Sequence, residues 1–257
     1  MPWNPDIYNQ FKAIRYKPFY DLAGLIAGDS AKKAIDIGCG TGEQTYILSQ
    51  KFKETDFTGI DASAEMLAKS GEWKSDRLHF KQQTVEAVIT TGEKWDLIFS
   101  NSVLQWSDDH ETLFPAIISL LNEEGEFAIQ MPVQKENVLN QLLTKLAQEE
   151  PYLTQLDGFN RPSPVLSMDQ YVTLMFENGL QDIQVMQKVY PIIANDHQTL
   201  FDFISGSALI PYLERLSAQE HDSFLKEFKA RIAGHFPALP AIYAFKRLLL
   251  YGRKRKS

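Results

Sequence analysis

A carboxylate and three glycines share one short segment, residues 34–42, which reads Ala-Ile-Asp-Ile-Gly-Cys-Gly-Thr-Gly. Gly38, Gly40 and Gly42 lack a Cβ and adopt positive φ angles easily, so the backbone here can lie directly against a ligand. The carboxylate of Asp36 would repel a phosphate group but would attract a ligand that carries positive charge. The segment therefore predicts a site for a cationic small molecule.

The spacing of the glycines separates this segment from the two common phosphate-binding loops. Glu43 stands where a dinucleotide-binding loop would place its third glycine, and no Gly-Lys-Ser/Thr of a P-loop follows. Asp61 closes the next apolar run, where a carboxylate can accept hydrogen bonds from both hydroxyls of a ribose. Asp61 can instead cap the helix that begins at this point, although Ser63 suits that role equally well. Together these features predict a nucleoside with a cationic group and no phosphate.

Charge and composition exclude some classes of partner. The chain of 257 residues has a net charge of −7 and a pI near 5.3, which disfavours nucleic acid. The basic end, Gly-Arg-Lys-Arg-Lys-Ser, is expected to be a solvated tail. No apolar run is long enough for a bilayer and no signal peptide is evident, so we expect a cytoplasmic protein without membrane contact. We expect no metal site, and we interpret Cys39 as a small residue in a tight turn rather than as a catalytic thiol.

Short apolar runs alternate with helical segments from residue 33 to residue 131, which is typical of a parallel sheet with crossover helices. The last of these helices is expected to end at a turn around Gly125, before the fifth strand. A sixth strand at 182–190 and a last strand at 241–252 enclose a helical insertion. The predicted strands of the first part are 33–37, 57–61, 78–82, 95–100 and 126–131, and its predicted helices lie near 43–53, 63–70 and 111–121.

At this point the chain resembles the class I S-adenosylmethionine-dependent methyltransferases, through Ala-Ile-Asp-Ile-Gly-Cys-Gly-Thr-Gly, Gly-Ile-Asp-Ala-Ser-Ala-Glu-Met-Leu and the segments 95–106 and 125–132. The resemblance implies an α/β, Rossmann-like, doubly wound sheet of seven mostly parallel strands, with a helical insertion before the last strand and an N-terminal lid helix. It also implies that S-adenosylmethionine is the cofactor. Many relatives carry an aspartate where this chain has Thr84. The residues implied to bind the cofactor are Asp36, Gly38, Gly40, Gly42, Asp61, Ala62, Met66, Thr84, Val85 and Asn101.

One methyltransferase domain is expected to span residues 1–257. Its expected parts are N-terminal lid helices at 1–30, a cofactor-binding core at 31–132, the remainder of the core at 133–195, a helical acceptor-side insertion at 196–240, and the last strand with the basic tail at 241–257. Pro18 is expected to break or kink the N-terminal helix near Lys17.

The segments 3–22, 100–110 and 129–132 are similar to those of trans-aconitate methyltransferases and related carboxylate methyltransferases. This closer resemblance implies that Asn101, Gln105 and Trp106 line the reaction centre and that Gln130 lies on its far wall. Ile210 stands where trans-aconitate enzymes tend to have an arginine, which favours an acceptor with fewer carboxylates and more apolar surface.

A carboxylate acceptor needs a cation to hold it. Arg15 is the first candidate, for acceptor binding and for catalysis, and Lys17 is the second, because the arginine fork matches a carboxylate. Tyr8 and Phe11 share a helix face with Arg15 and are expected to contact the acceptor as well, as is Trp106. His110 is interpreted as the first residue of a helix or, alternatively, as a general base.

Several functions remain open at this stage. The main prediction is an enzyme that esterifies a carboxylate of a small acid, similar to trans-aconitate. The alternatives are a malonyl-acyl-carrier-protein methyltransferase docked through the basic tail, a methyltransferase of a hydroxyl or carbon on a quinone-like lipid, and a module that binds S-adenosylmethionine without catalysis.

Overall fold

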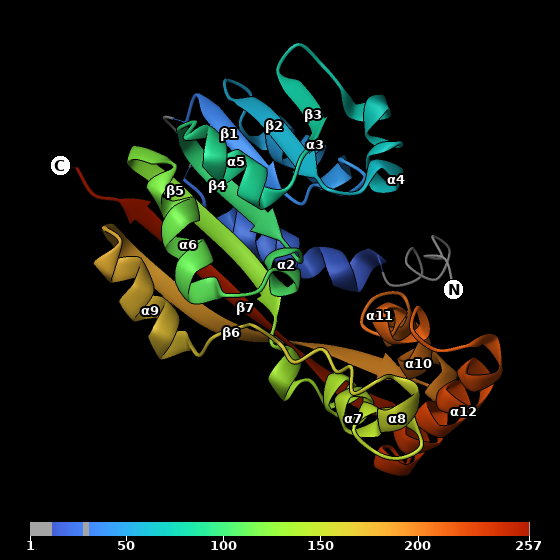
Figure 1. Cartoon of the computed structure of the whole chain (residues 1–257). Coiled ribbons are helices and arrows are strands. Elements are labelled where there is room, and N and C mark those ends of the chain that lie inside the picture. Colours follow the sequence, from blue (N-terminus) through green and yellow to red (C-terminus); the bar gives the residue numbers. More distant parts are fainter. Residues whose placement is uncertain (1–11, 28–30, 257) are drawn as a thin grey trace. The chain divides into compact units, whose positions relative to one another are not determined.

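The computed structural model describes residues 12–27 and 31–256. Seven strands form one sheet, in the order β3-β2-β1-β4-β5-β7-β6 (Figure 1). The chain order reverses between β1 and β4, so the fold has its topological switch point there. The α/β class and the seven-stranded, mostly parallel sheet are confirmed. The first five strands, which pair in parallel with one another, are β1 (Lys33–Ile37), β2 (Asp56–Asp61), β3 (Leu78–Gln82), β4 (Trp95–Asn101) and β5 (Leu121–Pro132).

Backbone contacts gather the chain into two compact units. The described residues of the sheet unit are 18–27, 31–131, 164–188 and 247–256, and those of the helical unit are 12–17, 132–163 and 189–246. β6 (Leu180–Ala194) and β7 (Ala241–Lys254) contribute residues to both units. The single domain over residues 1–257, with its divisions at 30, 132, 195 and 240, stays a prediction.

The sheet unit buries apolar side chains on both faces of its strands. Phe19 and Leu48 lie in one cluster with Ala128 of β5. Phe127, the neighbour of Ala128, points to the opposite face, because side chains alternate along a strand, and there it packs against Phe114 with 5.9 Å between the ring centroids. Helices therefore cover both faces, as a doubly wound sheet requires. The helices of this unit are α2 (Lys12–Leu25, begun in the helical unit), α3 (Glu43–Lys51), α4 (Ala64–Leu67), α5 (Val85–Thr91), α6 (His110–Ser119) and α9 (Met168–Glu177), with short 3₁₀ helices at Ser70–Trp73 and Leu104–Trp106.

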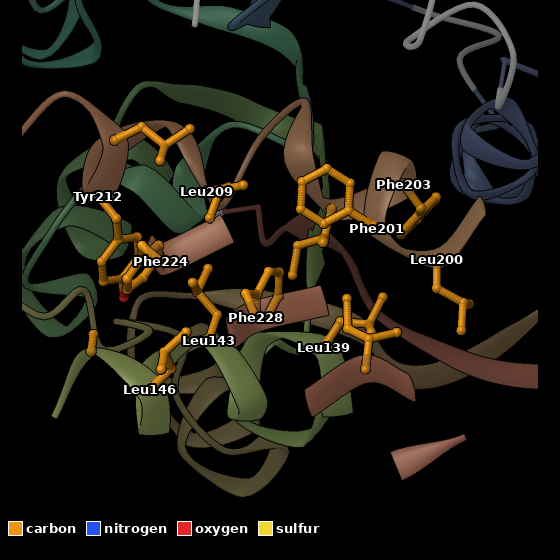
Figure 2. Close-up of a cluster of buried hydrophobic side chains, with 14 of the residues drawn as sticks. Leu139, Leu143, Leu146, Leu200, Phe201, Phe203, Leu209, Tyr212, Phe224 and Phe228 are labelled. Atoms are coloured by element: carbon orange, nitrogen blue, oxygen red, sulfur yellow. The ribbon is translucent and has the colours of Figure 1, made fainter. Parts of the chain in front are cut away.

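The helical unit has a separate apolar core, shown in Figure 2. Leu139, Leu143 and Leu146 recur at helical spacing and are fully buried together with Phe224 and Phe228. The predicted insertion between the sixth and the last strand is confirmed as a set of helices. The helices of this unit are α7 (Val138–Ala147), α8 (Tyr152–Gln155), α10 (His197–Ser205), α11 (Ile210–Leu213) and α12 (Ala218–His235), with a 3₁₀ helix at Gln134–Glu136.

The structure departs from the predicted elements most clearly between α6 and β5, at α5 and at Pro18. α6 ends at Ser119 and β5 starts at Leu121, which pairs with Trp95, so the residues before Gly125 are strand and the prediction of a helix there was wrong. α5 was not predicted. α2 continues through Pro18 without a break, because burial of an apolar face can outweigh the single backbone hydrogen bond that proline removes. Tyr8 and Phe11 lie outside the described residues.

The basic end of the chain is not simply solvated. β7 continues to Lys254, whose Nζ donates to the carbonyl of Asn178 at 2.7 Å. The guanidinium of Arg255 lies 4.5 Å from the ring centroid of Phe176, and Lys256 forms an ion pair with Glu124 at 3.2 Å. The expectation of a solvated tail was therefore wrong for Lys254 and Arg255, which are half-buried, whereas Lys256 is exposed.

A membrane-spanning helix or a metal centre would change the class of protein. No helix in the described residues combines the length and the apolar character needed to cross a membrane. Across 12–27 and 31–256, no three His, Cys, Asp or Glu side chains gather as ligands for a metal ion.

Candidate active site

The glycine turn, residues 38–42, joins β1 to α3 at the switch point of the sheet. The backbone amides of Gly38 and Cys39 both donate to the carbonyl of Ile60 at 2.8 Å, which ties the turn to the end of β2. Gly38, Gly40 and Gly42 have φ angles of 78°, 56° and 82°, in the left-handed region that glycine adopts at least cost. Ligands of open α/β sheets bind at such a position, beyond the carboxyl ends of the strands.

The three glycines differ in what lies beside them. A Cβ at residue 38 would stand 2.1 Å from Cγ2 of Val103, and one at residue 42 would stand 2.7 Å from the ring of Phe80. At Gly40 the nearest atom is the terminal methyl of Met66, 3.1 Å away, at the end of a flexible side chain. The protein's own side chains therefore use the room at residues 38 and 42, and Gly40 has the most room beside its backbone of the three.

Asp61 connects the end of β2 to the glycine turn. Its Oδ2 accepts from the amide of Gly40 and its Oδ1 accepts from the amide of Ser63, both at 2.9 Å. The side chain of Ser63, not that of Asp61, caps α4 by accepting from the amide of Met66. A carboxylate has about four lone-pair positions, so each oxygen of Asp61 keeps one acceptor position for a ligand hydroxyl.

Asp36 lies beneath the turn and is 2% exposed. Thr45 Oγ1 donates to its Oδ2 at 2.6 Å. Burial raises the pKa of Asp36 from 3.8 to about 7; the hydrogen bond from Thr45 opposes this shift, and the charge of Asp61 adds to it. Burial and these two carboxylates also raise the pKa of the Cys39 thiol, so Cys39 is no thiolate, in agreement with its interpretation as a small turn residue.

The raised pKa of Asp36 predicts a pH dependence of stability. Between pH 3.8 and about 7 the folded chain holds a proton that the unfolded chain has released, so the free energy of unfolding falls as pH rises through this window. Above about pH 7 this contribution is flat. We therefore expect Asp36→Asn to gain stability relative to the wild type between pH 5 and pH 7, by at most about 1.4 kcal/mol per pH unit. Urea unfolding of both proteins across this range checks it, and a difference that does not change with pH would contradict it.

The four residues expected beside the adenine lie at or near the starts of two helices of the sheet unit, α4 and α5. Thr84 caps the unpredicted helix α5, with its Oγ1 accepting from the amide of Ala87 at 3.3 Å. Val85 begins that helix and is 8% exposed. Ala62 is exposed and Met66 is half-buried, next to Gly40. Their contact with an adenine ring stays a prediction.

Polar side chains gather where β4 and β5 end. Asn101 and Gln130 are partners in the register of these two strands, and the amide of Ser102 donates to the carbonyl of Gln130 at 2.9 Å. Gln105 Nε2 donates to the carbonyl of Ser102 at 2.7 Å. Arg247, from the neighbouring strand β7, donates to Ser102 Oγ and, at 2.7 Å, to Gln130 Oε1. We call Ser102, Gln105, Gln130 and Arg247 the Ser102 cluster.

Three buried side-chain amide atoms of this region lack a hydrogen-bond partner in the described part of the chain: Asn101 Oδ1, Gln105 Oε1 and Gln130 Nε2. Each unsatisfied atom costs about 1 to 3 kcal/mol. Asn101 Nδ2 donates to Gln44 Oε1 at 2.8 Å, so the amide nitrogen of Asn101 has a partner. Its amide oxygen, Oδ1, is still able to accept a hydrogen bond from a ligand. Polar atoms left in this state fit a site that a polar ligand completes.

His110 and Trp106 flank this region in different ways. The ring of His110 is buried, with Nε2 bonded to the carbonyl of Leu104 at 2.9 Å and Nδ1 to the hydroxyl of Tyr171 at 2.5 Å. Burial lowers the pKa of His110, so the neutral ring donates to Leu104 and accepts from Tyr171. Both nitrogens are therefore engaged, one by Leu104 of the 3₁₀ helix and the other by Tyr171 of α9, which supports the helix-start interpretation over a general base. Trp106, at the end of that 3₁₀ helix, is 37% exposed.

Arg15 and Lys17, the predicted acceptor cations, belong to the helical unit. Arg15 Nη2 donates to the carbonyl of Phe203 at 2.9 Å, and the guanidinium lies 5.1 Å from the centroid of the Phe203 ring. Lys17 is exposed. The roles of both residues in acceptor binding stay predictions, and Arg15 has a structural contact within its own unit.

Sequence reasoning missed Arg247, Gln44 and Val103. Gln44 and Val103 gave no signal, because only the fold brings them to the turn. Arg247 did give one, since it is a charged residue inside the apolar run Ala-Phe-Lys-Arg-Leu-Leu-Leu-Tyr of a predicted strand. A charge at such a position is buried only for a reason.

A Rossmann-like sheet with a glycine turn after β1, a carboxylate ending β2 and no phosphate-binding loop defines the class of S-adenosylmethionine-dependent methyltransferases. The model of a methyltransferase domain family matches residues 28–195. The chain belongs to this methyltransferase family.

Two relatives are similar to this chain over nearly its full length. A trans-aconitate 2-methyltransferase of Deinococcus radiodurans is 37% identical over 255 residues, covering 97% of each chain. A trans-aconitate 2-methyltransferase of Escherichia coli is 31% identical over 258 residues, covering 98% of each. The similarity thus includes the helical unit as well as the sheet unit.

Solved structures agree on the fold. The YcgJ protein of Bacillus subtilis has a TM-score of 0.60 at 17% identity, covering 94% of this chain and 100% of its own. The phosphoethanolamine N-methyltransferase 2 of Haemonchus contortus, solved with S-adenosylmethionine, has a TM-score of 0.53 at 18% identity, covering 97% of this chain and 53% of its own. Identity this low supports the fold alone.

Proposed function

We propose that this methyltransferase esterifies a carboxylate of a small acid, and that trans-aconitate is the acceptor to test first. The family membership supports methyl transfer from S-adenosylmethionine. The names of the full-length relatives support a small carboxylic acid as the acceptor. The observation that carries the proposal is the chemistry of the Ser102 cluster, whose amides, hydroxyl and guanidinium form hydrogen bonds and leave a carboxylate ionised.

The residues of the glycine turn fit the cofactor. Gly40 has room beside its backbone, Asp61 keeps acceptor positions for the ribose hydroxyls, and Asn101 has a buried oxygen that needs a donor. Asp36 adds negative charge beneath the turn when it is ionised, which favours a cationic ligand. When bound, S-adenosylmethionine supplies a methyl group on a positively charged sulfur.

The reaction needs no proton transfer when the acceptor is a carboxylate. A carboxylate oxygen forms the new bond to the methyl carbon, the bond from that carbon to sulfur breaks, and the electron pair stays on sulfur. One negative and one positive charge are lost together, so an ester and a neutral thioether result. The protein must therefore align the acceptor and exclude water rather than supply a base.

Two alternatives lose support from the structure. A quinone-like hydroxyl would need a general base, and both ring nitrogens of His110 are already hydrogen-bonded. Docking of an acyl carrier protein rested on the basic tail, whose cations at Lys254, Arg255 and Lys256 have partners in the sheet unit. The third alternative, a module that binds S-adenosylmethionine without catalysis, is distinguished from an enzyme by the acid screen described next.

A screen of acids tests the proposal directly. The purified full chain is incubated with S-adenosylmethionine and a panel of mono-, di- and tricarboxylates, a malonyl thioester and a quinol, and products are identified by mass. We expect a gain of one methyl group on a carboxylate, together with an equal amount of S-adenosylhomocysteine. Methylation of the quinol or of the thioester alone would replace the proposal with that alternative, and cofactor binding without any methylated product would support the binding module.

A further inference from the structure

Arg247 is a buried cation in the middle of strand β7. Its side chain is 6% exposed, and arginine keeps its charge even when buried. Taking a guanidinium out of water costs several kcal/mol, so a buried arginine needs hydrogen bonds or charges that compensate. Ser102 Oγ and Gln130 Oε1 accept two of its hydrogen bonds. This position is a costly one for a residue that only fills space.

Gln130 is fixed in one orientation by these contacts. Its Oε1 accepts from Arg247 at 2.7 Å and from Ser102 Oγ at 3.1 Å. Rotating the amide by a half turn would place its NH₂ against the guanidinium, donor against donor. Nε2 therefore points away from Arg247, and in residues 12–27 and 31–256 it is buried without a partner, on a side chain that is 0% exposed.

The Ser102 cluster therefore presents a buried positive charge and, beside it, a buried amide donor with no acceptor. A carboxylate fits this pair, because its negative charge complements the guanidinium and one of its oxygens can accept from the amide. The cluster is formed at the ends of β4 and β5, next to Asn101, where the methylation chemistry is proposed.

We propose that Arg247 and Gln130 anchor a carboxylate of the acceptor that is not methylated, so that the enzyme selects acids with at least two carboxylates. The inference rests on the proposed function. A carboxylate whose charge is complemented by a guanidinium and whose oxygen accepts from an amide is a poorer nucleophile, so the anchored group is a spectator and a second carboxylate reacts. This preference for at least two carboxylates contrasts with the sequence-based expectation from Ile210, which favours an acceptor with fewer carboxylates.

A series of three unsaturated acids tests this role. trans-Aconitate, trans-glutaconate and trans-crotonate carry three, two and one carboxylates. Ester formation is measured as kcat/KM for each acid, and the dissociation constant of glutaconate is measured in the presence of S-adenosylhomocysteine. For the wild type we expect glutaconate to exceed crotonate by about 10- to 150-fold, the range for a hydrogen bond to a charged group.

Arg247→Met should reduce the ratio of glutaconate to crotonate to a few-fold, through a higher KM for glutaconate, and should weaken the binding of glutaconate in the presence of S-adenosylhomocysteine. Gln130→Glu is the second variant, because it gives the guanidinium a carboxylate from the chain itself and should lower the same ratio without removing the cation. Arg253→Met is the matched control. Arg253 lies on the same strand, is partly exposed and should keep the wild-type ratio.

The outcomes separate the two proposals. Wild-type protein that binds glutaconate but forms no ester on any acid refutes the proposed function and leaves the anchor in place, provided that Arg247→Met loses this binding. A wild type that binds no dicarboxylate, or that treats glutaconate and crotonate alike, overturns the anchor. A wild-type ratio in Gln130→Glu overturns it as well, even if Arg247→Met fails to fold.

Discussion

Asp61→Ala is expected to weaken S-adenosylmethionine binding by about 2 to 4 kcal/mol, because it removes two hydrogen bonds from a ribose to a charged acceptor. This corresponds to a dissociation constant raised roughly 30- to 700-fold. The carboxylate also accepts from the amides of Gly40 and Ser63, so the variant loses the link between β2 and the glycine turn as well. Both losses act on the same ligand site.

Calorimetric titration of the full chain with S-adenosylhomocysteine measures this effect without turnover. Asp56→Ala is the matched control, since Asp56 begins the same strand, has an exposed side chain and lies at the opposite end from the turn. Its affinity should equal that of the wild type. An unchanged affinity in Asp61→Ala would remove the ribose assignment, and an equal loss in both variants would indicate a general effect on β2.

The strands of the cofactor half could be read from the sequence because each is a short apolar run between turn residues. β1 and β3 begin and end where they were predicted, and β2 and β4 differ by one residue. Residues 121–125 were misread because Asn122, Glu123 and Glu124 lack a strand pattern. There Leu121 pairs with Trp95, and Glu124 has a φ of 61°, with a shift in the register of β4 against β5. Such an irregularity depends on the neighbouring strand and not on local sequence.

The acceptor side was harder to predict than the cofactor side. The glycine turn and Asp61 lie at the ends of two adjacent strands, so knowing the strands was enough to bring them together. Arg247 reaches Gln130 from a strand 117 positions later in the chain. Only the order of strands along the sheet, in which β7 lies next to β5, makes them neighbours. The sequence therefore favoured Arg15, a cation close to the motif in the chain, over one close to it in the fold.

The glycines of the turn show that one residue type can serve two purposes. The sequence predicted that all three leave room for a ligand, whereas at residues 38 and 42 the space beside the backbone is occupied by Val103 and Phe80. Val103 precedes the 3₁₀ helix that carries Gln105 and Trp106. Close packing of Val103 on Gly38 therefore sets how the acceptor-side loop approaches the cofactor turn, and a change at Gly38 should affect both.

Gly38→Ala is accordingly expected to cost about 2 to 6 kcal/mol of the free energy of unfolding. A left-handed φ of 78° costs a residue with a Cβ about 1 to 3 kcal/mol, and forcing a methyl into occupied space costs about the same again. The added Cβ would lie 2.1 Å from Val103 Cγ2, so the loop after β4 must move. For a domain of this size the loss should lower Tm by roughly 5 to 20 °C.

Thermal unfolding followed by circular dichroism measures the change, with two variants that separate its causes. Gly24→Ala is the control, because Gly24 lies in α2 with nothing within 4 Å of a Cβ, and its Tm should be equal or slightly higher. Gly38→Ala combined with Val103→Ala should show less than the sum of the two single losses, since the smaller side chain removes the overlap while the backbone strain remains. Additive losses would mean that Val103 does not pack on Gly38, and a wild-type Tm for Gly38→Ala alone would refute the geometry of the turn.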